Sequence, residues 1–129
     1  MNAEKIFSSI SEPQFSSMLY KRDQTAEDIA ALLLKAEKES RKYVPQIARF
    51  FKAPTIYETC ERIFFFLKHH VPYQREPAER QTAKTINRIM NDAKNGRGND
   101  CKHYSTLAVS VLNYLGIDCN FRLVSFYEN

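Results

Sequence analysis

The sequence predicts a predominantly helical domain, with helices first and a more tightly turned part after them. Apolar residues recur at helical spacing over most of the chain. All three glycines, Gly96, Gly98 and Gly116, lie in the last third of the 129 residues. A single hydrophobic core usually holds about 100–150 residues. We therefore expect one domain over residues 1–129, with a helical part over 1–70 and a second part over 71–129.

Composition excludes several classes of protein. The longest apolar run, residues 63–67, is far shorter than the roughly 20 residues of a transmembrane helix, and residues 1–17 lack the pattern of a signal peptide. Cys60, Cys101 and Cys119 form no close pair that would indicate a disulfide framework. We expect a cytoplasmic protein with no membrane partner.

The first two elements are predicted from a proline and a capping residue. The stretch 2–20 is weakly periodic and interrupted at Pro13, so we expect a short helix or arm and then a second turn. Thr25 is a good N-cap for the next helix, because its side chain accepts hydrogen bonds from unpaired backbone N–H groups. The apolar stripe of that helix consists of Ile29, Leu32, Leu33 and Ala36.

The next two helices begin at a proline and at a second threonine. Pro45 is predicted to begin a shorter helix through Phe51, since proline is tolerated in a first turn. Thr55 can cap a helix that runs to about His69, which we expect to be the central core helix. The predicted core face, widened by Phe65 and Phe66, consists of Ile56, Cys60, Ile63, Phe64 and Leu67.

Residues 71–100 are predicted to contain one helix between two loops. The segment 71–74 is expected to be extended, because the residue before Pro72 is pushed out of the helical region. A polar loop follows through Arg80, and a helix over about 85–93 then buries Ile86, Ile89 and Met90. Loop 95–100 contains two glycines that can take positive φ.

The net charge of +4 is unevenly spread. The segment 35–52 holds six Lys and Arg residues against Glu37 and Glu39. A basic face of this kind can meet nucleic acid. Since no nucleic-acid motif accompanies the charge, we interpret the segment as a solvated helix surface and expect no nucleic-acid partner.

Asp100 directly precedes a run with one apolar helix face, made of Tyr104, Leu107, Ala108, Val111, Leu112 and Leu115. Gly116 is predicted to end this helix. Asp100 as N-cap places Cys101 in the first turn on the face of Tyr104, so its sulfur is predicted to point inward. Unpaired N–H groups at the helix start and the nearby Lys102 favour a thiolate. Taken alone, however, Cys101 would be interpreted as a small buried hydrophobic residue.

The pattern around Cys101 resembles the transglutaminase-like cysteine peptidase superfamily. The matching residues are Val71-Pro72-Tyr73, Gln81, the run Gly98-Asn99-Asp100-Cys101-Lys102 with Tyr104-Ser105, and the segments 112–117 and 121–126. The resemblance covers residues 71–129 and is clearest over 96–125. It implies an α+β, papain-like fold in which the nucleophile helix leads into one or a few C-terminal strands. Proteins of this kind include bacterial and phage proteins.

The resemblance also implies a chemistry. Cys101 would be the nucleophile of a peptidase or amidase that acts on a peptide or protein by acyl transfer through a thioester. Gln81 would donate a hydrogen bond to the developing oxyanion, with the backbone N–H of Cys101 as a second donor. Gln81 can equally be an ordinary loop glutamine.

Three departures from the family pattern leave the activity open. Asn99 stands where the family usually has glycine, and His103 stands where an acidic residue is common. The third departure is that the sequence stops at Asn129, before the family's histidine and acid, which suggests an incomplete or degenerate domain. His103 lies about 200° around the helix from Cys101 and cannot be its base. His69 and His70 are expected to be structural, and would reach Cys101 only in a rearranged fold.

Two classes of function therefore remain, a cysteine hydrolase and a non-catalytic binding or assembly module on the same scaffold. A metal site at Cys101, His103 and Cys119 does not match zinc spacings, so we expect no metal and no cofactor. We also expect the final strand, about 119–127, to present an unpaired edge that associates with itself or another protein. The apolar residues of that edge are Phe121, Leu123 and Phe126.

Overall fold

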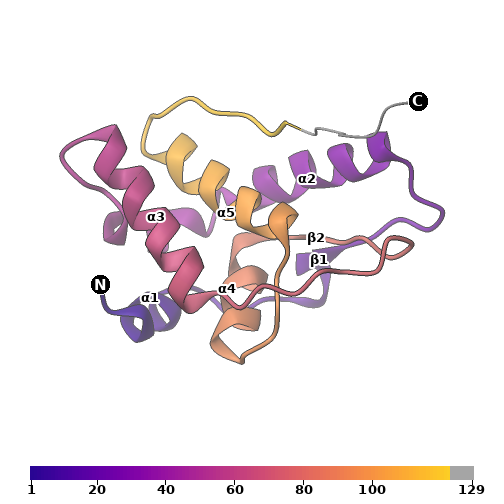
Figure 1. The fold of residues 1–129 in the computed structure, drawn as a ribbon, viewed down its shortest axis with the longest axis horizontal. Helices are drawn as coiled ribbons and strands as arrows, with labels where there is room; N and C mark the ends of the chain where they lie inside the picture. Colours follow the sequence, from indigo (N-terminus) through magenta and orange to yellow (C-terminus); the bar gives the residue numbers. More distant parts are fainter. Residues whose placement is uncertain (123–129) are drawn as a thin grey trace.

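The computed structural model describes residues 1–122, and the helix α5, Cys101–Tyr114, lies at its centre. α5 runs between α2 (Ala26–Ser40) and α3 (Ile56–His70) and also packs on α4 (Ile86–Lys94) (Figure 1). The short α1 (Ala3–Ser9) packs against α4. α5 therefore takes the central place that the sequence suggested for α3.

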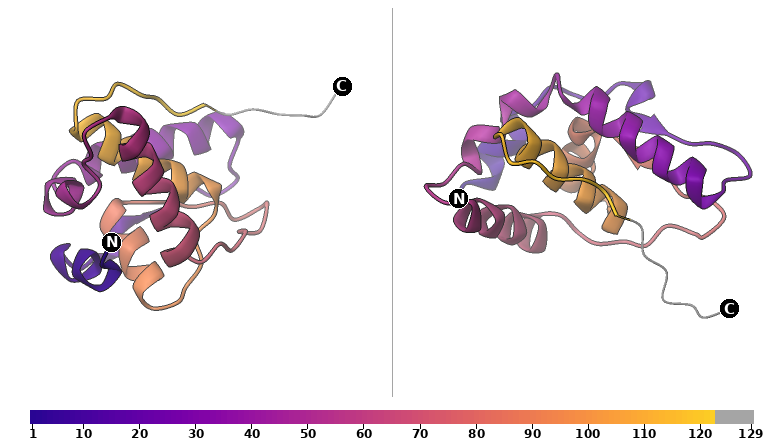
Figure 2. Two further views of the ribbon diagram at one scale, coloured as in Figure 1. Left: turned by 60° about the vertical axis from the view of Figure 1, so that its left-hand side comes forward. Right: turned by 90° about the horizontal axis from the view of Figure 1, so that it is seen from above.

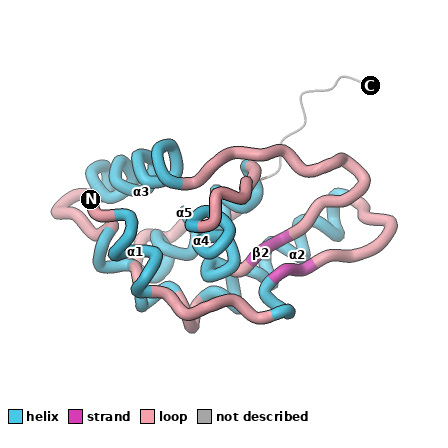
Figure 3. The backbone as a smooth tube through the Cα atoms, turned by 90° about the horizontal axis from the view of Figure 1, so that it is seen from below, coloured by secondary structure: helices cyan, strands magenta, loops and turns pink. Residues whose placement is uncertain are grey.

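Two short strands join distant parts of the chain. β1 (Met18–Leu19) pairs antiparallel with β2 (Ala83–Lys84), as the two magenta segments of Figure 3 show. A 3-10 helix, Phe15–Ser17, precedes β1. The mostly helical content confirms the prediction, but these strands lie before α5 rather than after it.

The main core lies where α1, α3, α4 and α5 meet. Phe66 of α3 packs edge-on against Phe51, with ring centroids 5.3 Å apart. A smaller cluster joins α2 to the strand pair through Leu19, Leu33, Ala36 and Ala83. The main core contains Ile6, Val44, Ile47, Ile63, Ile86, Ile89, Met90, Leu107 and Val111.

The predicted helix starts at Thr25 and Thr55 are confirmed. Thr25 Oγ1 accepts a hydrogen bond from the N–H of Asp28 (3.2 Å), and the Asp28 carboxylate accepts one from the N–H of Thr25 (2.9 Å). Thr55 Oγ1 accepts from the N–H of Glu58 (3.1 Å). Side chains that accept from the first-turn amides fix where each helix begins. α4 is also confirmed, with the predicted Ile86, Ile89 and Met90 all buried.

Two predictions about residues 45–69 are wrong in detail. The stretch predicted as one helix from Pro45 forms two 3-10 helices, Val44–Gln46 and Ala48–Phe50. In α3, Phe64 is 58% exposed, and Ile56, Cys60 and Phe65 are also exposed. Five successive apolar residues carry no periodicity of their own, so tertiary packing chooses the face. The residues that α3 buries are Thr59, Ile63, Phe66 and Leu67.

The segment after α5 turns at Gly116, whose φ of +84° confirms the predicted helix end. Residues 117–122 then run back along α5 (Figure 2). Within the described part of the predicted final strand, residues 119–122 form no strand, and Phe121 packs on the cluster of Leu33 and Ala36. The rest of that predicted strand, with Leu123 and Phe126, lies outside the described residues. None of the helices in residues 1–122 is long and apolar enough to cross a membrane.

Gly96 and Gly98 have different roles, although the sequence leaves both free to take positive φ. Only Gly96 does so, with a φ of +73° and nothing within 4 Å of an added Cβ. A Cβ on Gly98 would lie 2.0 Å from Gln74 Cβ. Gly98 is therefore required because two backbone segments approach each other closely.

Gly98→Ala is accordingly expected to cost about 3 kcal/mol of unfolding free energy, because the loops must separate. Gly96→Ala is the matched control, and its strained φ should cost about 1 kcal/mol. Urea denaturation of both variants measures the difference. Equal costs would contradict the close approach of residues 74 and 98.

Candidate active site at the start of α5

A reciprocal pair of hydrogen bonds fixes the start of α5. The Asp100 carboxylate accepts from the N–H of Lys102 (3.1 Å), and the N–H of Asp100 donates to His103 Nδ1 (3.0 Å). This is a capping box in which histidine replaces the usual glutamate or glutamine. The sequence predicted the cap but not the role of His103 in it.

His103 is a fully buried, neutral imidazole. Because Nδ1 accepts from Asp100, Nε2 carries the proton and donates to the carbonyl oxygen of Thr82 (3.0 Å). Burial, and next the charge of Lys84, lower the pKa of His103 to about 4. His103 is enclosed while Cys101 is exposed, which confirms that the two side chains diverge.

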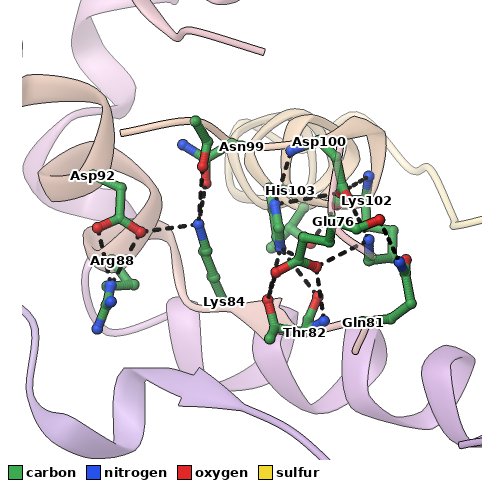
Figure 4. Close-up of polar contacts among 12 residues, drawn as sticks. Glu76, Gln81, Thr82, Lys84, Arg88, Asp92, Asn99, Asp100, Lys102 and His103 are labelled. Carbon is green, nitrogen blue, oxygen red and sulfur yellow. Dashed lines mark hydrogen bonds and ion pairs between the residues drawn. The ribbon is translucent and has the colours of Figure 1, made fainter. Parts of the chain in front are cut away.

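A buried ion pair network surrounds the imidazole (Figure 4). Glu76 accepts two hydrogen bonds from Thr82, from its N–H (2.8 Å) and its hydroxyl (2.6 Å). The ammonium of Lys102 pairs with Asp100 and lies 3.3 Å from Glu76 Oε1. The charge of Lys102, expected to assist the thiol of Cys101, is therefore compensated by two carboxylates.

Cys101 is exposed, so the prediction that its sulfur points inward is wrong. Within residues 1–122, its thiol has no hydrogen-bond partner. Tyr104, one turn later, donates its hydroxyl to the carbonyl of Val71 and packs edge-on against Tyr73, with centroids 5.6 Å apart. The apolar periodicity does not set the buried side of the first turns, because polar residues fill it, namely Lys102, His103 and Thr106.

Gln81 is held within its own loop. Its side-chain amide donates to the backbone carbonyls of Glu76 (3.2 Å) and Pro77 (2.8 Å). Its backbone N–H donates to the side chain of Gln24 (3.1 Å). Both protons of the Gln81 side-chain amide thus have acceptors in the loop, and no hydrogen bond within residues 1–122 joins Gln81 to Cys101. An oxyanion role for Gln81 requires these bonds to break.

The comparisons with known proteins add one finding. A family model described as the transglutaminase-like superfamily matches residues 41–128. The chain belongs to the transglutaminase-like superfamily. No curated protein and no solved structure matches it.

The superfamily match confirms the resemblance and extends it upstream from residue 71 to residue 41, through α3. It gives the chain a cysteine-hydrolase-type scaffold with an α+β, papain-like core. The match therefore crosses residue 70, where the sequence predicted the boundary between a helical part and a second part.

Asn99, a departure from the transglutaminase-like pattern, ties three segments together. Its side-chain oxygen accepts from Lys84 Nζ (2.9 Å), and its side-chain amide donates to the carbonyl of Ile89 (3.3 Å). Its backbone donates to Pro72 O and accepts from Gln74 N, both at 2.9 Å. This residue anchors the turn that carries Asp100 and Cys101, which a glycine would leave without side-chain bonds.

Behind Asn99 lies a buried carboxylate that the sequence reasoning missed. Asp92 is shared by three cations, Lys84 Nζ (2.9 Å), Arg88 Nε (3.0 Å) and Arg97 Nε (2.9 Å). Burial opposes ionisation of Asp92, but the bonds from Lys84 and the arginines outweigh it and lower the pKa of this carboxyl. The available signal was an aspartate three residues after Ile89, at the edge of the helix face predicted from Ile86, Ile89 and Met90.

The one cluster of three potential metal ligands in the described part of the chain does not fit a metal ion. Glu76, Asp100 and His103 each offer an atom within 4.8 Å of the others. Both imidazole nitrogens are engaged, and the Lys102 ammonium already binds both carboxylates. Since Cys101 and His103 diverge, they cannot share an ion either.

Proposed function

We propose that this chain carries the nucleophile of a cysteine hydrolase, with Cys101 as the reacting residue and a peptide or protein as substrate. The observation that carries the proposal is an exposed thiol at the rigidly capped start of a helix in a transglutaminase-like scaffold. A base would take the proton of the Cys101 thiol, and the thiolate sulfur would attack the carbonyl carbon of an amide. The C–N bond would then break as the base returns this proton to the departing amine, and the acyl group would stay on Cys101 as a thioester. Water, or an acceptor amine, would then release the acyl group.

The backbone of Cys101 supplies a donor for the oxyanion of this reaction. Its N–H has no hydrogen-bond partner within residues 1–122. Because first-turn amides of a helix point outward along the axis, this N–H would be free to donate to the charge that develops on the attacked carbonyl. Gln81 stays a second, less accessible candidate, since its amide is bound to its own loop.

The base of the proposed reaction comes from outside residues 1–122. His103 is buried and bonded through both nitrogens. His69 and His70 line a different cavity, with Phe50 and Phe65, that Cys101 does not line. The resemblance assigns the histidine and the acid to strands that follow the nucleophile helix.

The proposal predicts selective alkylation of Cys101. A helix N-terminus stabilises a thiolate, so iodoacetamide at about pH 6.5 should label Cys101 about two- to fivefold faster than Cys60, which lies exposed in mid-helix. Cys119 should react slowest, because burial and then the neighbouring Asp118 raise the pKa of its thiol. Peptide mass spectrometry after timed quenching reads each site. Equal rates at Cys101 and Cys60 would overturn the activated nucleophile.

A second arm tests the acyl transfer itself. With p-nitrophenyl acetate, Cys101 should form an acetyl thioester and release p-nitrophenolate. Cys101→Ser should lose this covalent adduct, whereas the matched variant Cys60→Ser should retain it. An adduct that survives in Cys101→Ser contradicts the proposed nucleophile.

An exposed apolar face favours a second candidate, a binding or assembly module. Ile56, Tyr57, Phe64 and Phe65 are all exposed on α3, which is typical of a surface that meets a partner. Absence of Cys101 labelling, together with self-association that Phe64→Glu abolishes in sedimentation velocity, would favour this non-catalytic function. The predicted association through the edge of residues 119–127 stays a separate prediction.

A further inference from the structure

A small cavity with an excess of positive charge lies beside the turn that leads to α5. Its volume is about 290 Å³, and Gln74 and Gly98 form part of its wall. Four cationic side chains against two carboxylates leave it a net charge of +2. These six are Arg75, Lys84, Arg88, Arg97, Glu76 and Asp92.

The two carboxylates are already committed to other groups. Glu76 accepts from the N–H and the hydroxyl of Thr82 and pairs with Lys102, which does not line the cavity. Asp92 alone serves Lys84 and two arginines. The excess of cations is therefore not neutralised by the residues that surround it.

The arginines have donors left for a ligand. Arg88 and Arg97 both reach Asp92 through Nε, at 3.0 and 2.9 Å. Nη2 of Arg97 also donates to the side-chain oxygen of Asn91 (3.3 Å), which leaves its Nη1 for a ligand. The terminal amino groups of Arg88 have no partner in residues 1–122, and the side chain of Arg75 has none there either. Guanidinium groups offer paired N–H donors in a geometry that matches an oxyanion.

We propose that this cavity binds an oxyanionic group, a phosphate or a carboxylate, through Arg75, Arg88 and Arg97. Lys84, whose side chain is only 5% exposed, adds a fixed positive charge at its inner wall. The ligand would lie against Gly98, two residues before the N-cap Asp100. Binding of this anion does not require Cys101 to be a nucleophile.

The test uses inorganic phosphate and acetate as probes on the full chain. Each is titrated at constant ionic strength against sodium chloride, because screening alone shifts charged groups. Backbone amide resonances of residues 74–76 and 97–98 are expected to shift and to reach saturation. Tighter phosphate binding indicates a phosphorylated ligand, and tighter acetate binding indicates a carboxylate ligand.

Variants distinguish a specific anion site in this cavity from nonspecific electrostatic attraction of anions to the basic surface. Arg75→Gln removes an exposed cation without a structural partner and is expected to weaken binding about two- to fivefold. Arg88→Gln should weaken it about tenfold or more, since two donors are lost. Arg80→Gln, on the same loop but outside the cavity, should leave affinity unchanged. The proposal is overturned if neither probe acts beyond chloride, or if Arg75→Gln binds as tightly as Arg80→Gln.

Discussion

Replacing Asp92 with asparagine is expected to destabilise the fold by about 3–5 kcal/mol, the largest effect of any single polar substitution proposed for this chain. The Asp92 side chain is 3% exposed, and it compensates the ammonium of Lys84, which is 5% exposed. Without the carboxylate, the largely buried ammonium of Lys84 stays charged and keeps only the neutral oxygens of Gly98 and Asn99 as partners. The loss of the carboxylate costs less at Arg88 and Arg97, because their side chains are 27% and 57% exposed and water can solvate their charges.

Replacing Lys84, the cationic partner of Asp92, should cost much less unfolding free energy. Lys84→Met leaves Asp92 paired with both arginines, and mainly loses the hydrogen bonds to Asn99 and Gly98, about 1–2 kcal/mol. The double variant Lys84→Met/Asp92→Asn should then be more stable than Asp92→Asn alone, since no buried charge is left unpaired. Urea denaturation of the three variants completes the cycle. Additive costs would show that the two residues do not act as a pair.

The pair also connects the core to the candidate site. Lys84 bonds Asn99, and Asn99 is two residues before Cys101. Loss of Lys84 therefore loosens the turn that presents the thiol, while the capping box of Asp100 and His103 stays intact. Slower alkylation of Cys101 in a folded Lys84→Met variant would link the buried ion pair to the site.

Local signals predicted the helices of this fold well. Thr25, Thr55 and Asp100 act through backbone amides within their own first turns, so sequence alone locates the helix starts. The strand pair was missed because β1 and β2 are two residues each and far apart in the chain. Propensity and periodicity carry no information at that length.

In the candidate site, too, local features were predicted from the sequence and features set by tertiary contacts were not. The position of Cys101 at a capped helix start follows from the adjacent Asp100 and was predicted. The burial of His103, and with it the outward orientation of Cys101, depends on Thr82 and Glu76, which lie 21 and 27 residues before His103. No spacing rule joins a loop to a helix turn, so the polar network became visible only in the structure.

His103 is expected to make the fold acid-labile between about pH 6.5 and pH 4. Its pKa falls from its ordinary value of 6.5 to about 4 in the folded chain, mainly because it is buried. Below pH 6.5 the unfolded chain therefore takes up a proton that the folded chain does not. Stability is full above pH 6.5 and declines as the pH falls, by about 3 kcal/mol at the low end.

His103→Gln isolates this effect, because glutamine at the third helical position still accepts from the N–H of Asp100 in a capping box but does not titrate. Urea midpoints measured from about pH 7.5 to pH 4.5 should fall steeply for the natural chain and much less for His103→Gln. His69→Gln, at an exposed helix end, is the matched control and should keep the natural dependence of stability on pH.

The carboxyl groups of Asp92 and Asp100 do not account for this dependence of stability on pH. Although burial opposes their ionisation, their cationic neighbours lower both pKa values, so these groups stay charged through this range. An unchanged slope in His103→Gln would mean that the imidazole is not held neutral by its burial.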